Sequence, residues 1–361
     1  MSRLAENNKK LVYVAMSGGV DSSVAAALLK QEGHKVVGVF MKQWQPDVGD
    51  FCIWKEEREE AAKAAASLNI PFKTWDFTKE YKKQVADYMI REYKLGRTPN
   101  PDVMCNKEIK FGLFLKRALS EGADFIATGH YVRKITKGAF GAKKAPFVSC
   151  GSYLYQGKDK NKDQSYFLWT LKEKEIERCL FPVGGYTKPE IRKLAKKFKL
   201  PNAGKKDSQG VCFIGPLNVK DFLLKRIKSK KGEIIKDGQA IGTHDGVFYY
   251  TIGQRHGLDI KSGDGPFYVI GKDVEKNIIY VGSEKDLKST KTVVSNLSWV
   301  NGPIKLPARI DVKIRYRTKS EKAILSDDGN LEFDKPVRAI TSGQSAVFYR
   351  GQLLLGGGVI K

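Results

Sequence analysis

The sequence predicts an α/β fold class: an N-terminal doubly wound parallel sheet, then a small central domain of helices and strands, then a C-terminal antiparallel β-barrel. Three observations support this. Short apolar runs alternate with helical patterns in the first half, short β runs follow from about Gly232, and 361 residues are enough for two or three domains. We place the boundaries near 215 and 285, which gives domains at 1–215, 216–285 and 286–361.

In the first half, four apolar runs are typical of strands, and the segments between them are suited to helices. The expected strands cover residues 11–16, 35–41, 70–77 and 124–128, and the expected helices cover 22–30, 55–68, 79–95 and 107–119. Repeated succession of strand and helix favours a parallel sheet with helices on both faces. Such sheets bind ligands at the carboxyl ends of their strands, so the loops after Met16, Met41 and Thr128 are the first places to look for a site.

The second half has a different pattern. Two helical segments at 188–198 and 219–227 come first, and then short alternating β runs separated by turn residues continue to the end of the chain. Turn signals at intervals near ten residues indicate small antiparallel barrels or sandwiches.

Charge and composition limit the partners and the compartment. The 64 Lys and Arg against 40 Asp and Glu leave a net charge of +24. Such a field favours a polyanionic partner, with nucleic acid as the first candidate, although the lysines could also serve only to solubilise the chain. Five irregularly spaced cysteines, no apolar leader and no apolar run long enough to span a membrane predict a reducing cytoplasm and no membrane partner.

The strongest local motif is LVYVAMSGGVDSSVAAALL at residues 11–29. A buried strand runs into two glycines, an acid and two serines, and an Ala-rich helix begins at once. Converging N–H groups and the helix dipole make an anion cradle, and the lack of a GxxxxGK[ST] pattern means that no lysine of the loop holds the terminal phosphates. The segment SGGxDS resembles the PP-loop of ATP pyrophosphatases. The alternative is an ordinary strand-to-helix turn with Ser22 as N-cap.

Two further segments carry cysteines in polar surroundings. In residues 96–112 two prolines favour a stiff loop, and Asn106 is a plausible N-cap for the next helix, which would put Cys105 at a helix N-terminus near lysines and lower its thiol pKa. The alternative is a buried packing cysteine. Cys212 follows a Gly-containing turn with two lysines nearby. No CxxC pattern is present and the four histidines are scattered, so a metal site is weakly supported, although His130 follows a predicted strand.

Six segments occur in an order that is highly specific as a set. From residue 15 to 258 they are AMSGGVDSSVAA, GRTPNPDVMCNKEIKFG, ATGHYVR, KDQSYFLW, DSQGVCFIG and YTIGQRHGL. Together they resemble the tRNA-specific 2-thiouridylase family, which uses a PP-loop. The resemblance implies an ATP-dependent transferase that replaces O2 of the wobble uridine of certain tRNAs with sulfur.

The resemblance also implies roles for individual residues. Mg²⁺ would be held near the pyrophosphate by Asp21, and the ATP-binding residues would be Ala15, Met16, Ser17, Gly18, Gly19, Val20, Asp21, Ser22, Ser23, Met41 and Gly129. After adenylation of the uracil oxygen, Cys212 would carry a persulfide received from a sulfur-donor protein. Cys105 would be the partner thiol that forms a disulfide with Cys212, and Asp102 would be the general acid or base.

The family resemblance implies a tRNA surface as well. Asn100, Pro101 and Asp102 would line the pocket for a base swung out of the anticodon loop. The other matching positions are His130, Lys162, Asp163, Gln164, Arg315, Tyr316 and Gln344.

Three alternatives remain open at this point. The chain could be another PP-loop enzyme that amidates or modifies RNA, or a basic RNA-binding protein with a vestigial nucleotide site. The two thiols, with Asp102, could also hold an iron–sulfur cluster, which we do not favour over the persulfide.

Overall fold

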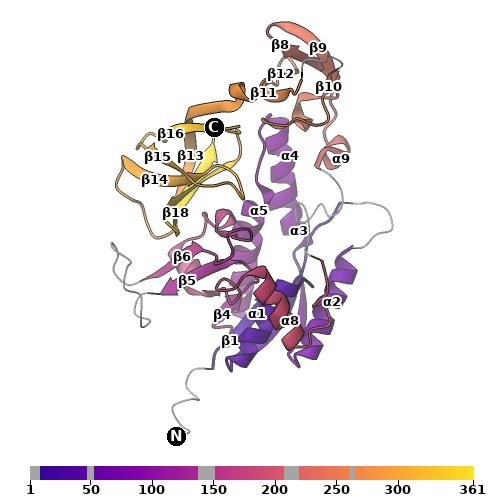
Figure 1. Cartoon of the computed structure of the whole chain (residues 1–361). Helices are drawn as coiled ribbons and strands as arrows, with labels where there is room; N and C mark the ends of the chain where they lie inside the picture. The colour runs from indigo at the N-terminus through magenta and orange to yellow at the C-terminus, as the bar shows by residue number, and fades with distance from the viewer. Residues whose placement is uncertain (1–8, 47–52, 137–150, 207–218, 261–264) are drawn as a thin grey trace.

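The computed structural model describes residues 9–46, 53–136, 151–206, 219–260 and 265–361. In this part of the chain there are three sheets: the one with β1 lies at the bottom of Figure 1, the one with β13 to β18 above it on the left, and the one with β8 to β12 at the top right. Cys52, Cys150 and Cys212 lie outside the described residues, as does most of the segment 205–215 that contains Cys212.

The first sheet is fully parallel and has the strand order β3-β2-β1-β4-β7. Its strands are β1 (Leu11–Ala15), β2 (Lys35–Lys42), β3 (Phe72–Asp76), β4 (Phe125–Ala127) and β7 (Cys179–Leu180). The order reverses beside β1, which puts a switch point at the carboxyl end of this strand. The predicted doubly wound parallel sheet is therefore confirmed, and the short fifth strand was not predicted.

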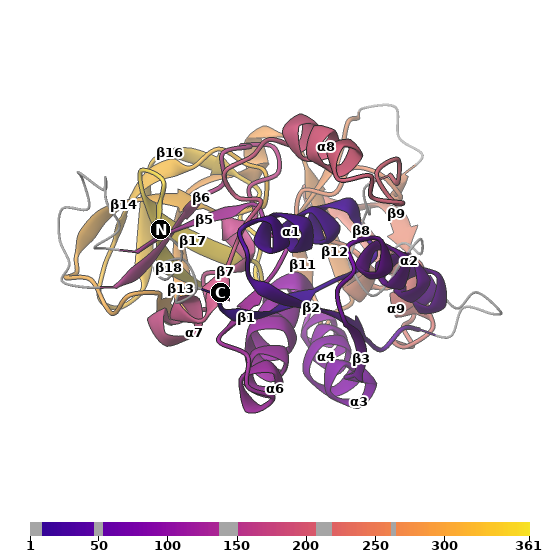
Figure 2. The ribbon, with the colours of Figure 1, turned by 90° about the horizontal axis from the view of Figure 1, so that it is seen from below.

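Helices cover both faces of this sheet (Figure 2). Val12 and Val14 of β1 pack against α1 (Val20–Gln31), α2 (Ile53–Ser67) and α8 (Lys188–Lys197). Tyr13 and Ala15 point to the opposite face, because successive strand residues alternate in direction. The helices on that face are α3 (Thr78–Tyr81), η2 (Lys82–Ala86), α4 (Asp87–Lys94), α5 (Pro101–Met104), η3 (Cys105–Phe114) and α6 (Leu115–Ser120).

The central domain begins with α9 (Val219–Leu224) and contains a sheet of order β10-β9-β8-β12-β11. Its strands are β8 (Gly232–Lys236), β9 (Gln239–His244), β10 (Asp259–Ile260), β11 (Tyr268–Asp273) and β12 (Ile278–Gly282), with short helices η5 (Val247–Tyr249) and η6 (Lys285–Leu287). The pair of β8 and β12 is parallel, in contrast to the antiparallel pattern that the sequence predicts, because a long connection separates the two strands.

The C-terminal strands close into a six-stranded antiparallel barrel, since β13 pairs with both β16 and β18. They are β13 (Lys288–Trp299), β14 (Ala308–Lys313), β15 (Glu321–Leu325), β16 (Asn330–Arg338), β17 (Ser345–Arg350) and β18 (Leu353–Ile360). The predicted C-terminal barrel is confirmed, and its closure leaves few exposed edges.

The barrel also receives elements from the N-terminal part of the chain. The hairpin of β5 (Val132–Thr136) and β6 (Ser152–Gln156) extends the barrel sheet through the pair of Tyr155 and Leu353. Two short helices follow, η4 (Ser165–Phe167) and α7 (Glu173–Glu177). Indole Nε1 of Trp169 donates to Ser345 Oγ at 3.0 Å, so the first domain and the barrel share a buried boundary. No helix among the described residues is long and apolar enough to cross a membrane.

Candidate active site

The loop between β1 and α1 lies at the carboxyl edge of the parallel sheet. Gly18 has φ +75°, and a Cβ there would lie 2.3 Å from the carbonyl oxygen of Glu57. Gly129, after β4, approaches the start of α1 so closely that a Cβ would lie 2.8 Å from the Ser22 nitrogen. Both positions therefore require glycine. Met41 is the last residue but one of the neighbouring strand β2 on the same edge, so the three loops predicted to bind a ligand come together.

The first turn of α1 has no side-chain cap. Gly19 is the N-cap residue, and it offers no side-chain acceptor to the N–H groups of the turn. The hydroxyl of Ser22 accepts from the Ser17 N–H at 3.2 Å and donates to the Gly19 carbonyl at 3.1 Å, and Ser23 donates to the same carbonyl at 3.1 Å. Ser22 is thus not the N-cap. Uncapped N–H groups at a helix start suit an anion such as phosphate.

Asp21 is the carboxylate of this loop. Its Oδ1 accepts hydrogen bonds from the Tyr131 hydroxyl and from Lys188 Nζ, both at 2.7 Å, and the side chain is 32% exposed. No group of three or more His, Cys, Asp and Glu that could hold a metal ion occurs among the residues the structure describes. One partly exposed carboxylate fits Mg²⁺, because Mg²⁺ is usually held by one or two carboxylates together with substrate phosphates.

The segment with Asn100, Pro101, Asp102 and Cys105 begins a single long helical run. Asn100 is its N-cap, and the Asn100 side chain accepts a hydrogen bond from the Val103 N–H at 3.3 Å. Cys105 comes five residues after Asn100 and therefore lies inside the helical run. The prediction that Asn106 caps this helix is wrong, because the two prolines do not prevent a helix that starts at Pro101. A proline is tolerated in the first turn, where its missing N–H has no partner to lose.

The environment of Cys105 also differs from the prediction. The residue is 1% exposed, and burial raises the pKa of its thiol, an effect that the Asp102 charge strengthens and Lys110 only partly offsets. The prediction that an open helix N-terminus lowers the pKa of the Cys105 thiol is therefore wrong. In the part of the chain that the structure describes, Cys105 and Cys179 are both buried thiols and not disulfide partners.

His130 lies beneath the same region. It is 6% exposed, its Nδ1 is 2.8 Å from Thr128 Oγ1, and its ring lies 5.6 Å from that of Phe111. Burial and the nearby Lys110 charge hold the imidazole pKa well below its usual value. This environment favours the neutral form of the His130 ring.

Three domains meet at the loop that precedes Asn100. The Thr98 N–H donates to the Ser342 carbonyl at 2.9 Å, and the Thr98 hydroxyl lies 3.3 Å from that of Thr251 in the central domain. Gln344 Nε2 donates to the carbonyls of Thr98 and Pro99 at 3.0 and 3.3 Å. Gln344, which is predicted to contact tRNA, thus borders the predicted base pocket, although it lies 242 positions after Asp102 in the chain.

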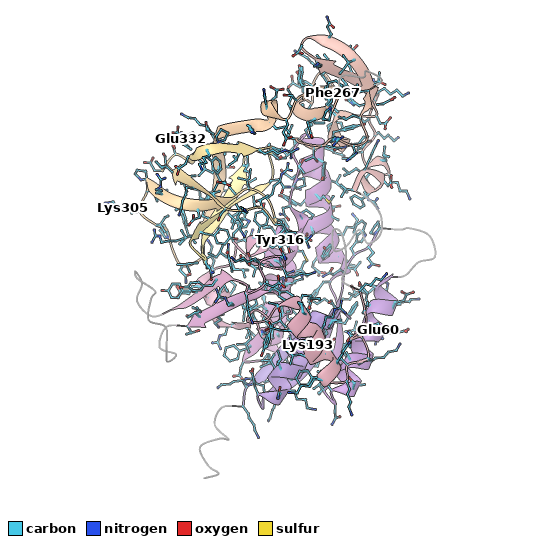
Figure 3. The ribbon with its side chains drawn as sticks, in the orientation of Figure 1. Glu60, Lys193, Phe267, Lys305, Tyr316 and Glu332 are labelled. Carbon is cyan, nitrogen blue, oxygen red and sulfur yellow. The ribbon has the colours of Figure 1, made fainter. Side chains whose placement is uncertain are left out.

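Arg315 and Tyr316 lie at the same junction. Arg315 Nη2 donates to the Ile252 carbonyl and to Thr341 Oγ1, both at 2.8 Å, and burial lowers its pKa. The ring of Tyr316 lies 4.5 Å from that of Phe167, in the region where the barrel meets the first domain (Figure 3). Both residues are partly exposed, which leaves them able to meet a ligand.

The three predicted tRNA residues at 162–164 have different surroundings. Gln164 Oε1 accepts from the Tyr131 N–H at 3.0 Å, and Lys162 is partly exposed. Asp163 is 5% exposed and its carboxylate accepts from the Gly157 N–H and from Lys313 Nζ of the barrel at 3.0 and 3.3 Å. Asp163 therefore holds the first domain against the barrel.

Comparison with known proteins decides the family. Residues 10–216 match the tRNA methyl transferase HUP domain, 220–283 its PRC-barrel domain, and 289–360 the aminomethyltransferase beta-barrel domain. The chain is 47% identical to the tRNA-specific 2-thiouridylase MnmA 1 of Geobacillus kaustophilus over 98% of this chain and 95% of that protein. It is 45% identical to the tRNA-specific 2-thiouridylase MnmA of Bacillus subtilis over 97% and 94%.

The chain belongs to the tRNA-specific 2-thiouridylase family. Its members are enzymes, as the sequence predicts. Among solved structures, the U34-tRNA thiolase NcsA from Methanococcus maripaludis, with its 4Fe-4S cluster, matches with a TM-score of 0.36 and 17% identity over 57% of this chain and 61% of that one. That match is too distant to bear on the site of a 2-thiouridylase.

Sequence reasoning missed three residues beside the loop between β1 and α1. Tyr131 and Lys188 hold Asp21, and Asn202 Nδ2 donates to the Gly18 carbonyl at 3.1 Å and to Ser23 Oγ at 3.0 Å. The pattern Thr-Lys-Pro-Glu at 187–190 does signal a helix start, because a Thr followed by Glu three residues later forms a capping box. No signal in the sequence indicates which loop that helix faces.

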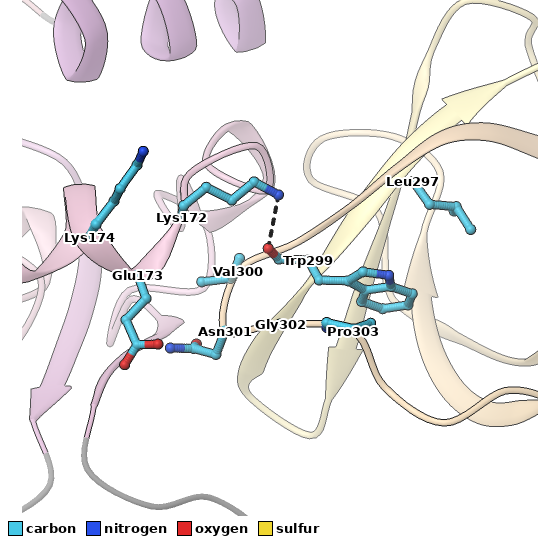
Figure 4. Close-up of a pocket in the computed structure, with 9 residues that line it drawn as sticks. All are labelled: Lys172, Glu173, Lys174, Leu297, Trp299, Val300, Asn301, Gly302 and Pro303. Carbon is cyan, nitrogen blue, oxygen red and sulfur yellow. Dashed lines mark hydrogen bonds between the residues drawn. The ribbon is translucent and has the colours of Figure 1, made fainter.

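A separate pocket of about 410 Å³ lies between the start of α7 and the chain after β13 (Figure 4). Lys172 crosses it to reach the Trp299 carbonyl at 3.1 Å. None of its nine lining residues is among those predicted to bind ATP or tRNA.

Proposed function

We propose that this protein replaces O2 of the wobble uridine of certain tRNAs with sulfur, after an ATP-dependent adenylation of that oxygen. The observation that carries the proposal is the 45–47% identity to proteins named tRNA-specific 2-thiouridylase over almost the whole of both chains. A net charge of +24 supports a tRNA partner, because cationic side chains displace counterions from the phosphate backbone.

ATP binds the loop at 15–23 together with Met41 and Gly129, and Asp21 holds Mg²⁺, which neutralises phosphate charge. The uncapped N–H groups of α1 and the exposed Asp21 carboxylate support this assignment. The uracil oxygen attacks the α phosphate, the bond from the α phosphorus to the bridging oxygen breaks, and pyrophosphate leaves. The adenylated oxygen then leaves as AMP when sulfur reaches C2.

The sulfur comes from a persulfide on Cys212 that a donor protein supplies. In one route the Cys105 thiolate attacks the inner persulfide sulfur, hydrosulfide leaves and attacks C2, and the two cysteines remain as a disulfide. In the other route the terminal sulfur attacks C2 directly and Cys105 then resolves the intermediate into the same disulfide. Asp102 moves the proton, and an external dithiol reduces the disulfide to both thiols in either route.

The tRNA lies over the junction of the three domains. Asn100, Pro101 and Asp102 receive the flipped base, and the remaining contacts are those of Lys162, Gln164, Arg315, Tyr316 and Gln344. His130 and Asp163 also match tRNA positions of the family, but both are buried here, so their contact with tRNA requires a rearrangement at the domain junction. The bonds from Gln344 to the Thr98 and Pro99 carbonyls support this placement, because they put the barrel beside the base pocket. We assign the activity to the cytoplasm, where tRNA and reducing thiols are present.

Sulfur transfer with a ³⁵S-labelled donor tests the proposal. Cys212→Ser should accept no label, whereas Cys105→Ser should accept it and fail to complete repeated turnovers. Both variants should still release pyrophosphate when tRNA and ATP are supplied, because neither cysteine belongs to the nucleotide loop. Cys179→Ala is the matched control, since Cys179 is equally buried at 1% exposure and lies in β7.

Two results would overturn the proposal. Absence of pyrophosphate release with any tRNA would leave an RNA-binding protein without chemistry. Full activity in both cysteine variants would favour a PP-loop enzyme that needs no redox thiols. Iron and inorganic sulfide in anaerobically purified protein, lost together with activity in Cys105→Ser, would replace the persulfide with an iron–sulfur cluster.

A further inference from the structure

A turn at 251–254 belongs to a segment that the proposed reaction leaves without a role. It lies within YTIGQRHGL, one of the six segments that carry the family resemblance. The Gln254 N–H donates to the Thr251 carbonyl at 3.0 Å and closes the turn. The Gly253 N–H donates to the Val269 carbonyl of β11 at 2.8 Å, so the turn is fixed to the sheet of the central domain.

Two arginines of the barrel domain converge on this turn. Arg315 Nη2 donates to the Ile252 carbonyl at 2.8 Å. Gly253 lies between Arg315 and Arg338, because a Cβ at Gly253 would be 3.6 Å from Arg315 Nη2 and 3.7 Å from Arg338 Nη1. Gly253 also has φ +85°, which residues with a side chain rarely adopt. No side chain of Gly253 therefore separates the two guanidinium groups.

Carboxylates do not balance the positive charge of this arginine pair. Among the residues that the structure describes, Arg315 has no carboxylate partner, and burial together with the nearby Arg338 charge lowers its pKa. Arg338 Nε lies 3.4 Å from Glu284 Oε1, but the two side chains are 40% and 60% exposed, and such pairs are weak. Lys288 adds another positive charge directly opposite Arg338 in the pairing of β13 and β16. An anion bound here would relieve the repulsion between these cations.

The arginine pair lies beside the predicted base pocket. The Thr251 hydroxyl lies 3.3 Å from the hydroxyl of Thr98, in the loop that leads into this pocket. On the barrel side, Arg315 donates to Thr341 Oγ1 at 2.8 Å, and the next residue, Ser342, accepts from the Thr98 N–H at 2.9 Å. A nucleotide whose base enters the pocket therefore brings its flanking phosphates to the same junction.

We propose that Arg338, together with Arg315, binds one of the two tRNA phosphates that flank the flipped wobble nucleotide. This inference rests on the proposed function, and it adds Arg338 and the turn at 251–254 to the residues predicted to contact tRNA. Guanidinium groups suit phosphate because their planar N–H groups can donate two parallel hydrogen bonds. Flipping a base costs unstacking energy, and a phosphate held by two oriented arginines offsets part of that cost.

A double-mutant cycle between the protein and the RNA tests this contact. The probe is a full-length tRNA with a wobble uridine, assembled by ligation with one uncharged methylphosphonate on the 5′ or the 3′ side of that uridine. Dissociation constants are measured by filter retention without ATP or sulfur donor. Arg338→Met should weaken binding of the unmodified tRNA about tenfold and reduce the slope of log K against log salt by about one.

The decisive result is the combination of the two changes. One of the two methylphosphonates should weaken binding to the wild-type protein by a factor similar to that of Arg338→Met. Together, that methylphosphonate and Arg338→Met should cost no more than about twofold beyond either change alone, because both remove the same contact. Losses that multiply at both flanking phosphates, or no loss of tRNA affinity in Arg338→Met, would overturn the inference.

Two further variants serve as controls. Arg338→Lys keeps the charge and should retain most of the affinity, which separates the contact from a folding defect. Arg309→Met is the matched control, since Arg309 is 61% exposed in β14 of the same barrel and pairs with Asp334. Any loss in Arg309→Met should multiply with the loss from either methylphosphonate. Coupling of Arg309 to both phosphates as strong as that of Arg338 would show that the effect is not a specific contact.

Failure of this inference and failure of the proposed function give different results. Coupling between Arg338 and a flanking phosphate, in a protein that never thiolates tRNA, would sink the proposed function alone. Thiolation by a wild-type protein in which Arg338 shows no coupling would sink the inference alone. A wild-type protein that binds no tRNA would sink both.

Discussion

The two ends of the proposed site differ in how completely they are formed. The nucleotide end, which comprises residues 15–23 with Met41 and Gly129, has a partly exposed carboxylate and an uncapped helix start. The thiol end, residues 100–105, has the Cys105 side chain 1% exposed within a helix, and burial raises the pKa of its thiol. The groups of the nucleotide end can thus be reached by a ligand, whereas the thiol of the other end is buried.

This difference separates the two chemical steps. In the proposed reaction, adenylation uses groups that are already in place in the first domain. The proposed sulfur transfer requires Cys105 to reach a base and a second sulfur, and we therefore expect it to depend on a change where the three domains meet at Thr98. Substitutions at the two ends should therefore give different phenotypes.

The largest effect should come from Asp21→Asn at the nucleotide end. The amide keeps the shape but loses the charge that Mg²⁺ requires, so tRNA-dependent pyrophosphate release should fall by about a thousandfold. Binding of tRNA, measured by filter retention, should stay within twofold of the wild type. Asp76→Asn is the control, since Asp76 ends β3 on the same sheet edge and pairs with Lys42 at 2.9 Å. Normal pyrophosphate release by Asp21→Asn would remove the distinction between the two ends.

A smaller effect, on stability, should come from Lys313→Met at the contact between the first domain and the barrel. This change leaves the Asp163 carboxylate, only 3% exposed, without its ion-pair partner. The free energy of unfolding should fall by about 3 kcal/mol, or roughly a hundredfold in the folding equilibrium, as measured by urea titration. Lys322→Met removes a pair with Asp311 in the same barrel in which the lysine is 58% exposed, and Asp311 keeps a hydrogen bond from the Gly351 N–H, so this change should cost less than about 1 kcal/mol. Equal costs for the two variants would show that Asp163 is not a buried anchor.

Alkylation of Cys105 probes the closed end directly. Because the thiol is buried and its pKa is raised, iodoacetamide at pH 7.5 should label it slowly in the free protein, and tRNA should raise the rate by about tenfold. Peptide mass spectrometry distinguishes it from Cys179, which is also buried and should stay protected in both states. Rapid labelling of Cys105 without tRNA would contradict the comparison.

Much of the nucleotide end was predictable because it is local in sequence. A strand, two glycines, an acid and a helix occur within nineteen residues, and the parallel sheet that positions them follows from repeated apolar runs. The barrel was predictable for the same reason, since alternating residues and turn signals are read over short windows. The domain boundaries near 215 and 285 stay predictions.

The missed features come from contacts between distant segments. Tyr131, Lys188 and Asn202 reach the loop through tertiary packing, which no periodicity reveals. Burial of Cys105 was weighed only as the alternative to an open helix N-terminus, because a helix starting at Pro101 was not expected. The strand pair of Tyr155 and Leu353 was missed because it joins two domains. Cys212 lies outside the described residues, so its approach to Cys105 stays a prediction.

The smallest expected effect belongs to Gln344→Ala, which tests whether the barrel supports the thiol end. The change removes two hydrogen bonds to the Thr98 and Pro99 carbonyls but keeps the main-chain bond from Thr98 to Ser342, so the loop stays in place and loosens. The KM for tRNA should rise about three- to fivefold, the loss expected for one or two neutral hydrogen bonds, and the KM for ATP should not change. Gln344→Glu should do more harm than alanine, because a carboxylate would face two carbonyl oxygens and could donate to neither. Gln352→Ala, at the exposed turn between β17 and β18, should leave both constants unchanged. A rise in the KM for ATP of the same size would mean that the two ends are coupled through the junction and do not act separately.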